Sequence, residues 1–236
     1  MRIDRGDRRN AINSETAQRL HDEFAAFDAD LDARVAILTG DDEAFCAGAD
    51  LRDLPRLRDS GPLGPTRMAL SKPVIAAIEG WCVAGGLELA AWCDLRVAGR
   101  SARFGCLERR WGVPLIDGGT VRLPRIVGLG RALDLILTGR EFDADEAERI
   151  GFVNRVVPAG SALETAVDLA AVIAESPWNA VVHDRASAYE GLGLGLDEAL
   201  ANEDTHGRTV IFDPGFRAGV DRFGDHQRVR REDGAR

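Results

Sequence analysis

Residues 71–94, SKPVIAAIEGWCVAGGLELAAWCD, constrain the fold of this chain more than any other stretch. Residues 73–78 form an apolar, partly β-branched run between a proline and a glycine, which predicts a buried strand. Gly85 and Gly86 then allow a tight turn, and residues 87–92 are mostly good helix formers. The segment therefore predicts a strand, a break and a helix.

The start of that predicted helix is a candidate site. The first N–H groups of a helix lack internal partners and can donate to a ligand atom, and the helix dipole favours negative charge there. Glu88 follows Gly85 by three residues, a spacing that places both on one helix face. A carboxylate beside a backbone donor suits catalysis, although paired glycines also occur where only close packing is needed.

Composition limits the classes of function. A chain of 236 residues with 45% hydrophobic and 29% charged residues can bury a proper core. Its net charge of −9 argues against binding to nucleic acid or to an anionic membrane. The composition is otherwise ordinary for a soluble protein.

The four cysteines, Cys46, Cys82, Cys93 and Cys106, form no Cys-x-x-Cys pair and have no clustered histidine. We expect buried free thiols and neither a zinc site nor any other metal. The N-terminal residues contain no apolar run typical of a secretory leader, and no later run is long enough for a membrane span. These features predict a cytoplasmic protein.

A repeated pattern indicates how the core is organised. Residues 45–51, FCAGADL, repeat features of the opening segment: a preceding strand and glycine, an aromatic–cysteine pair, small residues and an acidic–leucine pair. A weaker third copy runs over 95–108 and includes Glu108. Repeated units that cannot bury their faces alone predict a layered or spiral α/β core.

The remaining pattern predicts further elements around this core. Asn13 or Ser14 is a plausible N-cap for a helix that reaches about Phe27, and Asp143 caps a short helix. A mobile loop or broken helix is expected over 54–64. Further strands are expected at 35–39 and 153–157. Further helices are expected after 119, at 131–137 and at 161–175. We expect a core over 1–175 and a helical, oligomer-forming region over 176–236.

Taken together, these motifs resemble the crotonase superfamily, whose best-known members are enoyl-CoA hydratases and isomerases. The similarity covers about residues 8–175, and the order and spacing of its motifs are specific although each motif alone is weak. The residues that carry it are Asn10-Ala11, Leu38-Thr39-Gly40, Phe45 to Leu51, Lys72 to Ala76, Gly85 to Leu89, Cys93-Asp94, Phe104 to Glu108, Gly118-Gly119-Thr120, Arg122-Leu123-Pro124 and Ala147 to Val157.

The resemblance implies a spiral of repeated β-β-α units, a C-terminal helical region that packs in a trimer or hexamer, and an acyl-CoA thioester substrate without a cofactor. Two backbone N–H groups, which correspond to Ala49 and Gly85, would bind the thioester carbonyl oxygen. Ala47, Asp50 and Leu51 belong to the same motif and are expected at the substrate. The family usually has a further strand or hairpin before Asn10, so the first sheet is expected to be shorter here.

The resemblance also implies the chemistry. Glu88 and Glu108 match the two glutamates of hydratases, which add water to a trans-2-enoyl-CoA in fatty acid or related acyl-CoA metabolism. The alternatives are an enoyl-CoA or dienoyl-CoA isomerase and a protein of this fold that binds acyl-CoA or RNA with little turnover. The acyl chain is expected to contact 54–68 and the C-terminal helices.

One residue departs from the hydratase pattern. The turn that commonly reads Pro-Gly-Ala-Gly-Gly reads Leu-Ile-Asp-Gly-Gly at 115–119, which adds a third carboxylate, Asp117. Dienoyl-CoA isomerases also carry an aspartate there, so Asp117 is a third candidate catalytic residue that would face the same cavity as Glu108. Alternatively, Asp117 could cap the next helix by accepting an N–H from Gly119 or Thr120.

Overall fold

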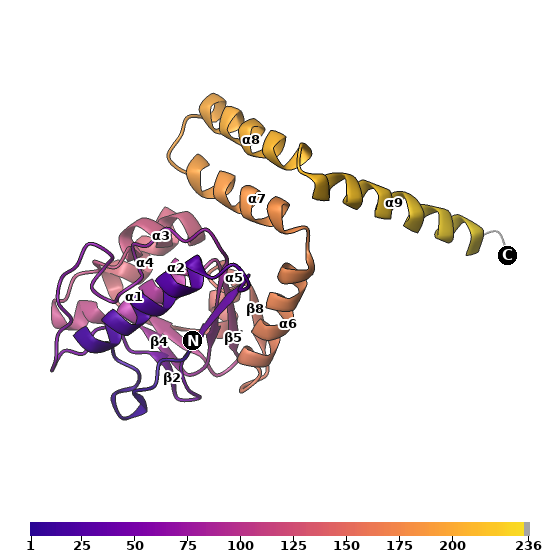
Figure 1. Ribbon diagram of the computed structural model, residues 1–236. Helices are drawn as coiled ribbons and strands as arrows, with labels where there is room; N and C mark the ends of the chain where they lie inside the picture. The colour runs from indigo at the N-terminus through magenta and orange to yellow at the C-terminus, as the bar shows by residue number, and fades with distance from the viewer. Residues whose placement is uncertain (234–236) are drawn as a thin grey trace. The chain divides into compact units, whose positions relative to one another are not determined.

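The computed structural model describes residues 1–233, with side chains described through residue 223. The chain divides into two units, Met1–Ala171 and a second that begins at Val172, inside helix α6 (Ala162–Glu175). The first unit holds every described strand and helices α1 to α5, and the second holds α7 to α9 (Figure 1). The candidate site described below lies entirely in the first unit.

Four parallel strands form the first sheet, in the order β1 (Ala36–Thr39), β3 (Val74–Ile78), β5 (Leu95–Gly99) and β8 (Arg155–Val157). All five residues of β3 are buried. A parallel strand covered on both faces needs apolar side chains at every position, which explains the continuous Val-Ile-Ala-Ala-Ile run. The strand predicted at 73–78 is confirmed.

The second sheet is made of three-residue strands, in the order β2 (Ala44–Cys46), β4 (Trp81–Val83), β6 (Arg103–Gly105) and β7 (Glu141–Asp143). The first three are parallel, and β7 runs antiparallel to β6. Strand β4 lies where the sequence predicts only a break. Three residues are too few to show a strand periodicity.

Successive strands alternate between the two sheets. The chain adds β1 and β2, then β3 and β4, then β5 and β6, so that each turn contributes one strand to each sheet. Register follows from turn to turn, with Cys46 opposite Cys82 and Cys82 opposite Phe104. Cys46 and Cys82 are therefore equivalent positions in the first two turns, although Trp81 lies opposite Ala44 rather than Phe45. The predicted spiral α/β core is confirmed.

Helices cover these turns. The Asn13 side chain accepts the Thr16 N–H at the start of α1 (Ser14–Ala29), as predicted, and Phe24 of α1 packs edge-on against Trp92 at 4.8 Å between ring centroids. Helix α2 contacts β2 and β4. The other helices of this unit are α2 (Gly85–Trp92), α3 (Gly119–Val127), α4 (Leu129–Thr138), α5 (Ala144–Arg149) and the 3₁₀ turns η1 (Gly6–Arg8) and η2 (Leu107–Trp111).

Buried aromatic rings join the second sheet to the segment before β8. Phe104 of β6 lies 5.4 Å from Phe142 of β7 and 5.7 Å from Phe152, measured between ring centroids. All four cysteines are buried free thiols, as predicted. These side chains contribute mainly hydrophobic burial, worth about 1.5–3 kcal/mol for each large residue.

The second unit is helical, as predicted. It contains α7 (Trp178–Gly191), α8 (Leu196–Ile211) and α9 (Pro214–Asp233), with α7 and α8 packed against each other. Gly193 and Gly195 lie in the connection between these two helices. Across the described residues, no helix combines the length and the apolar character that crossing a membrane requires.

Candidate active site

A cavity of about 600 Å³ opens in the first unit. Its wall is mainly apolar, and the three carboxyl groups singled out in the sequence, Glu88, Glu108 and Asp117, all line it. The other lining residues are Ala47, Ala49, Leu51, Leu54, Pro55, Leu57, Pro62, Leu63, Val83, Ala84, Gly85, Leu107, Trp111, Gly112, Val113, Pro114 and Ile116. An apolar cavity with a few converging polar groups is the usual form of a small-molecule site.

The backbone near Ala49 leaves one donor free on the cavity side. Ile12 donates to the Gly48 carbonyl at 2.8 Å and accepts from the Asp50 N–H at 2.9 Å. Successive N–H groups of an extended chain point to opposite sides, so the Ala49 N–H points away from Ile12. Within the described chain it donates to no protein acceptor.

Gly85 supplies a second donor. It is the first residue of α2, where the N–H groups have no partner inside the helix. The two donor segments lie very close, because a Cβ atom at Gly85 would lie 3.6 Å from the Ala49 nitrogen. Ala84, just before Gly85, has φ +53° and ψ −129°, a strained conformation for a residue other than glycine. Strain of this kind is typical of functional sites.

Glu88 extends from the first turn of α2 and is only 3% exposed. Its Oε1 accepts the Asp117 N–H at 2.9 Å and the Gly119 N–H at 2.7 Å. Burial raises the pKa of Glu88 to about 7, an effect that the negative charges of Asp117 and Glu108 reinforce and the two N–H donors oppose. A carboxyl group with this pKa can exchange a proton at neutral pH.

Glu108 lies in η2 and is 5% exposed. Both of its carboxylate oxygens are buried, and neither has a hydrogen-bond partner within the described residues. Burial raises the pKa of Glu108, because the charged form loses its hydration, and the positive charge of Arg109 offsets this effect only in part. The neighbours Arg109 and Arg110 make this glutamate look like a surface residue in the sequence, but Arg110 turns outward to Glu141.

Asp117 precedes α3 and is 3% exposed, and burial raises its pKa. Its Oδ1 accepts the Leu63 N–H at 3.0 Å and the Thr66 hydroxyl. The capping alternative is wrong, because the Gly119 N–H donates to Glu88, and the Asp117 side chain accepts from Leu63 and Thr66 rather than from Thr120.

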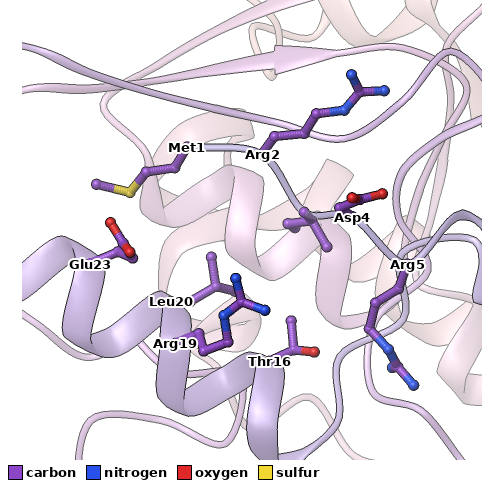
Figure 2. A pocket seen from close by; sticks show the side chains of 9 residues that line it. Met1, Arg2, Asp4, Arg5, Thr16, Arg19, Leu20 and Glu23 are labelled. Carbon is purple, nitrogen blue, oxygen red and sulfur yellow. The ribbon is translucent and has the colours of Figure 1, made fainter.

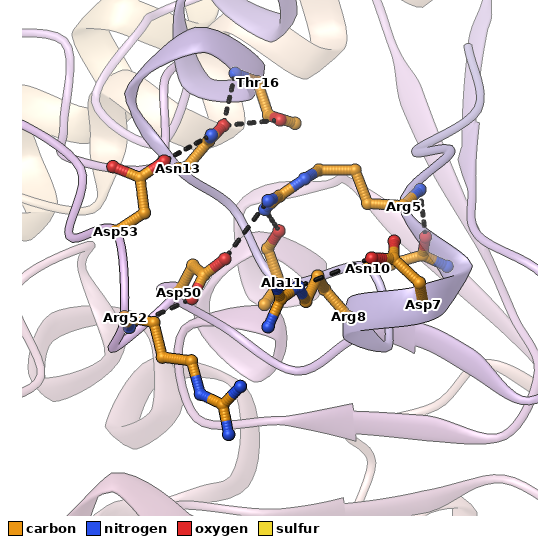
Figure 3. A network of polar contacts seen from close by, with 10 residues as sticks. All are labelled: Arg5, Asp7, Arg8, Asn10, Ala11, Asn13, Thr16, Asp50, Arg52 and Asp53. Carbon is orange, nitrogen blue, oxygen red and sulfur yellow. Dashed lines mark hydrogen bonds and ion pairs between the residues drawn. The ribbon is translucent and has the colours of Figure 1, made fainter.

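The structure separates the other predicted binding residues into two groups. Ala47 and Leu51 line the cavity beside Ala49, whereas Asp50 does not. The Asp50 carboxylate instead pairs with Arg5 at 3.1 Å and accepts the Arg52 N–H at 3.0 Å (Figure 3). Asp50 therefore holds the turn that presents the Ala49 N–H and does not reach the cavity.

Several wall residues were not named individually as candidate site residues in the sequence. Leu63 is 1% exposed, and its Cδ1 lies 2.6 Å from the position that a Cβ atom at Gly85 would take. Trp111 and Val113 contribute from η2 and the segment after it. The 54–68 segment expected at the acyl chain contributes Leu54, Pro55, Leu57, Pro62 and Leu63 to the wall. The sequence around Trp111, in contrast, gives no signal of an apolar wall.

A second cavity of about 270 Å³ lies between the N-terminal residues and α1. Figure 2 shows Arg19, Leu20 and Glu23 of α1 beside Met1. None of the three candidate carboxyl groups lines this cavity. In the described part of the chain, no group of three or more His, Cys, Asp or Glu residues is placed to hold a metal ion.

Known proteins share this arrangement of elements. A family model described as enoyl-CoA hydratase/isomerase matches residues 1–230. The chain is 37% identical over 210 residues to mevalonyl-coenzyme A hydratase of Aspergillus fumigatus, covering 85% of this chain and 76% of that protein. It is 38% identical over 211 residues to crotonyl-CoA hydratase of Syntrophomonas wolfei, covering 85% of this chain and 81% of that protein.

Solved structures agree. The crystal structure of an enoyl-CoA hydratase from Mycobacterium tuberculosis H37Rv superposes with a TM-score of 0.91 at 34% sequence identity, covering 95% of this chain and 91% of that one. Because the family model spans nearly the whole chain and both curated relatives exceed 35% identity, the chain belongs to the enoyl-CoA hydratase/isomerase family.

Proposed function

We propose that this protein is an enoyl-CoA hydratase that adds water to a trans-2-enoyl-CoA to give the 3-hydroxyacyl-CoA. The observation that carries the proposal is the convergence of Glu88 and Glu108 on one apolar cavity that also exposes the Ala49 and Gly85 backbone donors. Relatives named crotonyl-CoA hydratase and short-chain-enoyl-CoA hydratase, each 38% identical, support it.

The two glutamates suit opposite proton transfers. Glu88 accepts two backbone N–H groups, which favour its ionised form, so it would take a proton from the attacking water. Neither Glu108 oxygen has a hydrogen-bond partner among the described residues, and burial raises the pKa of Glu108, so it would be the proton donor. The water oxygen bonds to C3 while the C2–C3 double bond becomes a single bond, and Glu108 gives its proton to C2.

The backbone donors would stabilise the transition state. Attack at C3 builds negative charge on the thioester oxygen, which the Ala49 and Gly85 N–H groups would receive. One such donor is typically worth about 10²–10³ in rate. This chemistry needs neither a metal nor a cofactor, and acyl-CoA is the substrate.

The test follows the loss of the conjugated thioester absorbance of crotonyl-CoA. We expect turnover by the parent protein and a loss of at least about 10²-fold in Glu88→Gln and in Glu108→Gln, the scale of a positioned acid or base. Glu164→Gln, at an exposed position of α6, is the matched control and should retain parental turnover. Near-parental rates in both cavity variants would reject the assignment.

Isomerisation is the second candidate, because Asp117 adds a third carboxyl group to the cavity wall. An isomerase moves a proton between two carbons and adds no water, so the substrate separates the two reactions. Incubation of the parent with a 3-enoyl-CoA should give little conjugated product in the time that crotonyl-CoA is hydrated. A faster rate with the 3-enoyl-CoA would favour the isomerase.

A trimer or hexamer remains our prediction for the assembly. In the second unit, large apolar side chains are exposed in the single chain, and such patches favour a protein partner. They are Leu192, Leu194, Leu196, Leu200, Ile211 and Phe212. Light scattering at micromolar concentration should give three or six times the mass of the chain, and a folded monomer would contradict it. A cytoplasmic location also remains a prediction.

A further inference from the structure

The wall of the cavity beside Gly85 is an irregular segment. Residues 61–66 form turns without a helix or strand, yet they place Pro62 and Leu63 in the lining. A segment of this kind has few backbone hydrogen bonds of its own, so its position depends on contacts to the rest of the protein. Those contacts concentrate on Asp117.

Asp117 bonds to the segment through its side chain. Its Oδ1 accepts both the Leu63 N–H and the Thr66 hydroxyl, and Thr66 is fully buried. Two donors from a stretch of four residues therefore meet one oxygen. Their convergence favours the ionised form of Asp117 and fixes the direction of its carboxylate.

Arg122 of α3 strengthens the same connection. Its Nη1 donates to the Asp117 carbonyl at 3.0 Å, and its Nη2 donates to the Thr66 carbonyl at 2.6 Å. Thr66, Asp117 and Arg122 thus form a loop clamp in which side chains and carbonyls of both segments are held together. Nearby, Arg67 donates to the Ile116 carbonyl at 2.8 Å and adds a parallel bond at the surface.

The loop clamp contacts both parts of the site, the backbone donor of Gly85 and the carboxyl group of Glu88. On one side, Leu63 packs against Gly85, whose N–H is a candidate oxyanion donor. On the other, the Asp117 N–H donates to Glu88. An apolar side chain beside a backbone donor lowers the local water content and strengthens the donor's interaction with a developing charge.

We propose that Asp117 is a positioning residue for hydration, which holds Leu63 against Gly85 through its carboxylate and holds Glu88 through its backbone N–H. The inference rests on the proposed function. In this role Asp117 acts through its hydrogen bonds to Leu63 and Thr66 and transfers no proton. This role falls to a carboxylate that the hydratase pattern alone does not require.

The charge of Asp117 has a second effect on the same site. It raises the pKa of Glu88, the group that would accept the proton of water. Removal of that charge should move the acidic limb of the pH–rate profile to lower pH. A purely structural role would not move this limb.

The test compares variants that keep or remove the clamp bonds. Asp117→Asn keeps an acceptor oxygen for Leu63 and Thr66 but loses the charge, so the acidic limb should shift to lower pH while most of the binding of crotonyl-CoA persists. Asp117→Ala and Thr66→Val remove the contact, and each should raise KM or lower kcat by about tenfold, the scale of one lost buried hydrogen bond. Thr66→Ser keeps the hydroxyl and should recover the parental KM.

Hydrogen exchange of the segment gives a readout independent of activity. The amides of Gly61, Leu63, Gly64 and residue 66 should exchange faster in Asp117→Ala and Thr66→Val than in the parent, and not in Thr66→Ser. Melting temperatures identify any variant that is unfolded. If one of Asp117→Ala and Thr66→Val is unfolded, the other is compared with the parent. If the parent protein does not hydrate crotonyl-CoA but these amides still exchange faster in the variants, the clamp is supported and the proposed function is rejected.

Two results would overturn the inference. A loss of at least about 10²-fold in Asp117→Asn, with Thr66→Val near parental turnover, would make Asp117 a proton carrier. Unchanged exchange of residues 61–66 in both Asp117→Ala and Thr66→Val would show that the clamp does not position the segment.

Discussion

The Glu88 side chain lies so close to Gly119 that a Cβ atom at residue 119 would come within 2.9 Å of both its Cγ and its Oε1. The same glycine donates its N–H to Glu88 at 2.7 Å. Gly119, at the start of α3, therefore leaves room for the Glu88 side chain of α2 and also orients its carboxylate. Sequence order separates the two residues, and the spiral brings them together.

Gly119→Ala should therefore lower kcat by about tenfold or more, because the added methyl group displaces Glu88 from its working position by part of an ångström. Stability should change little, since Gly119 has no left-handed backbone conformation and alanine is a better helix former. Steady-state kinetics with crotonyl-CoA provide the measurement. Gly130→Ala, in α4 with open space around it, is the control and should leave kcat unchanged.

Gly48→Ala should abolish most hydration. Gly48 has φ +90°, and a Cβ atom there would lie 2.7 Å from the Gly85 nitrogen, so the methyl group would block one oxyanion donor. We expect a loss of about 10²–10³ in kcat. Gly128→Ala separates backbone strain from the clash, because Gly128 has φ +83° but no atom near the Cβ position. Equal losses in both variants would show that strain, not the blocked donor, is responsible.

The rate of hydration should fall as the pH decreases through about 7. Glu88 must be ionised to take a proton from water, and burial raises its pKa to about 7. The profile of kcat/KM against pH, measured between pH 5 and 9 with crotonyl-CoA, should show an acidic limb near that value. A limb near the ordinary glutamate pKa of about 4.3 would contradict the role given to Glu88.

Glu88→Gln should stabilise the folded protein at pH 8 and lose that advantage by about pH 4. The folded-state pKa of Glu88 is raised, so the folded protein binds the proton more tightly, and stability declines as the pH rises from about 4.3 to 7. Glutamine removes this cost, which is on the order of 3 kcal/mol because one pKa unit corresponds to about 1.4 kcal/mol. Urea unfolding at both pH values measures the difference; a gain that does not depend on pH would have another cause.

The parts of the fold that were predicted correctly are those with local signals. The five-residue β3 is apolar throughout, and the start of α1 has its Asn13 cap, so each is visible in a short window of sequence. Strands β4 and β6 have only three residues each and are set by register with neighbouring turns. No window of sequence contains that information.

The site divides in the same way. Glu88 and Gly85 share one helical turn, so their proximity follows from helix geometry alone. The burial of Glu108 follows from tertiary packing, although its neighbours in sequence are charged. The contact between Asp117 and Thr66 joins residues 51 positions apart. Because the sequence does not show this contact, it leaves a helix cap and a catalytic role as equally good explanations for Asp117.

The close approach of Gly48 and Gly85 implies a division of labour within the scaffold. The two segments belong to consecutive rungs of the spiral, joined through the pairing of β2 with β4, so the separation of the donors is fixed by the spacing between neighbouring strands. Of the three carboxyl groups, Glu88 follows Gly85 in α2, whereas Glu108 and Asp117 come from η2 and from the segment before α3. A redesign could therefore replace positions 88 and 108 and change the reaction while the two donors that receive the thioester oxygen keep their separation.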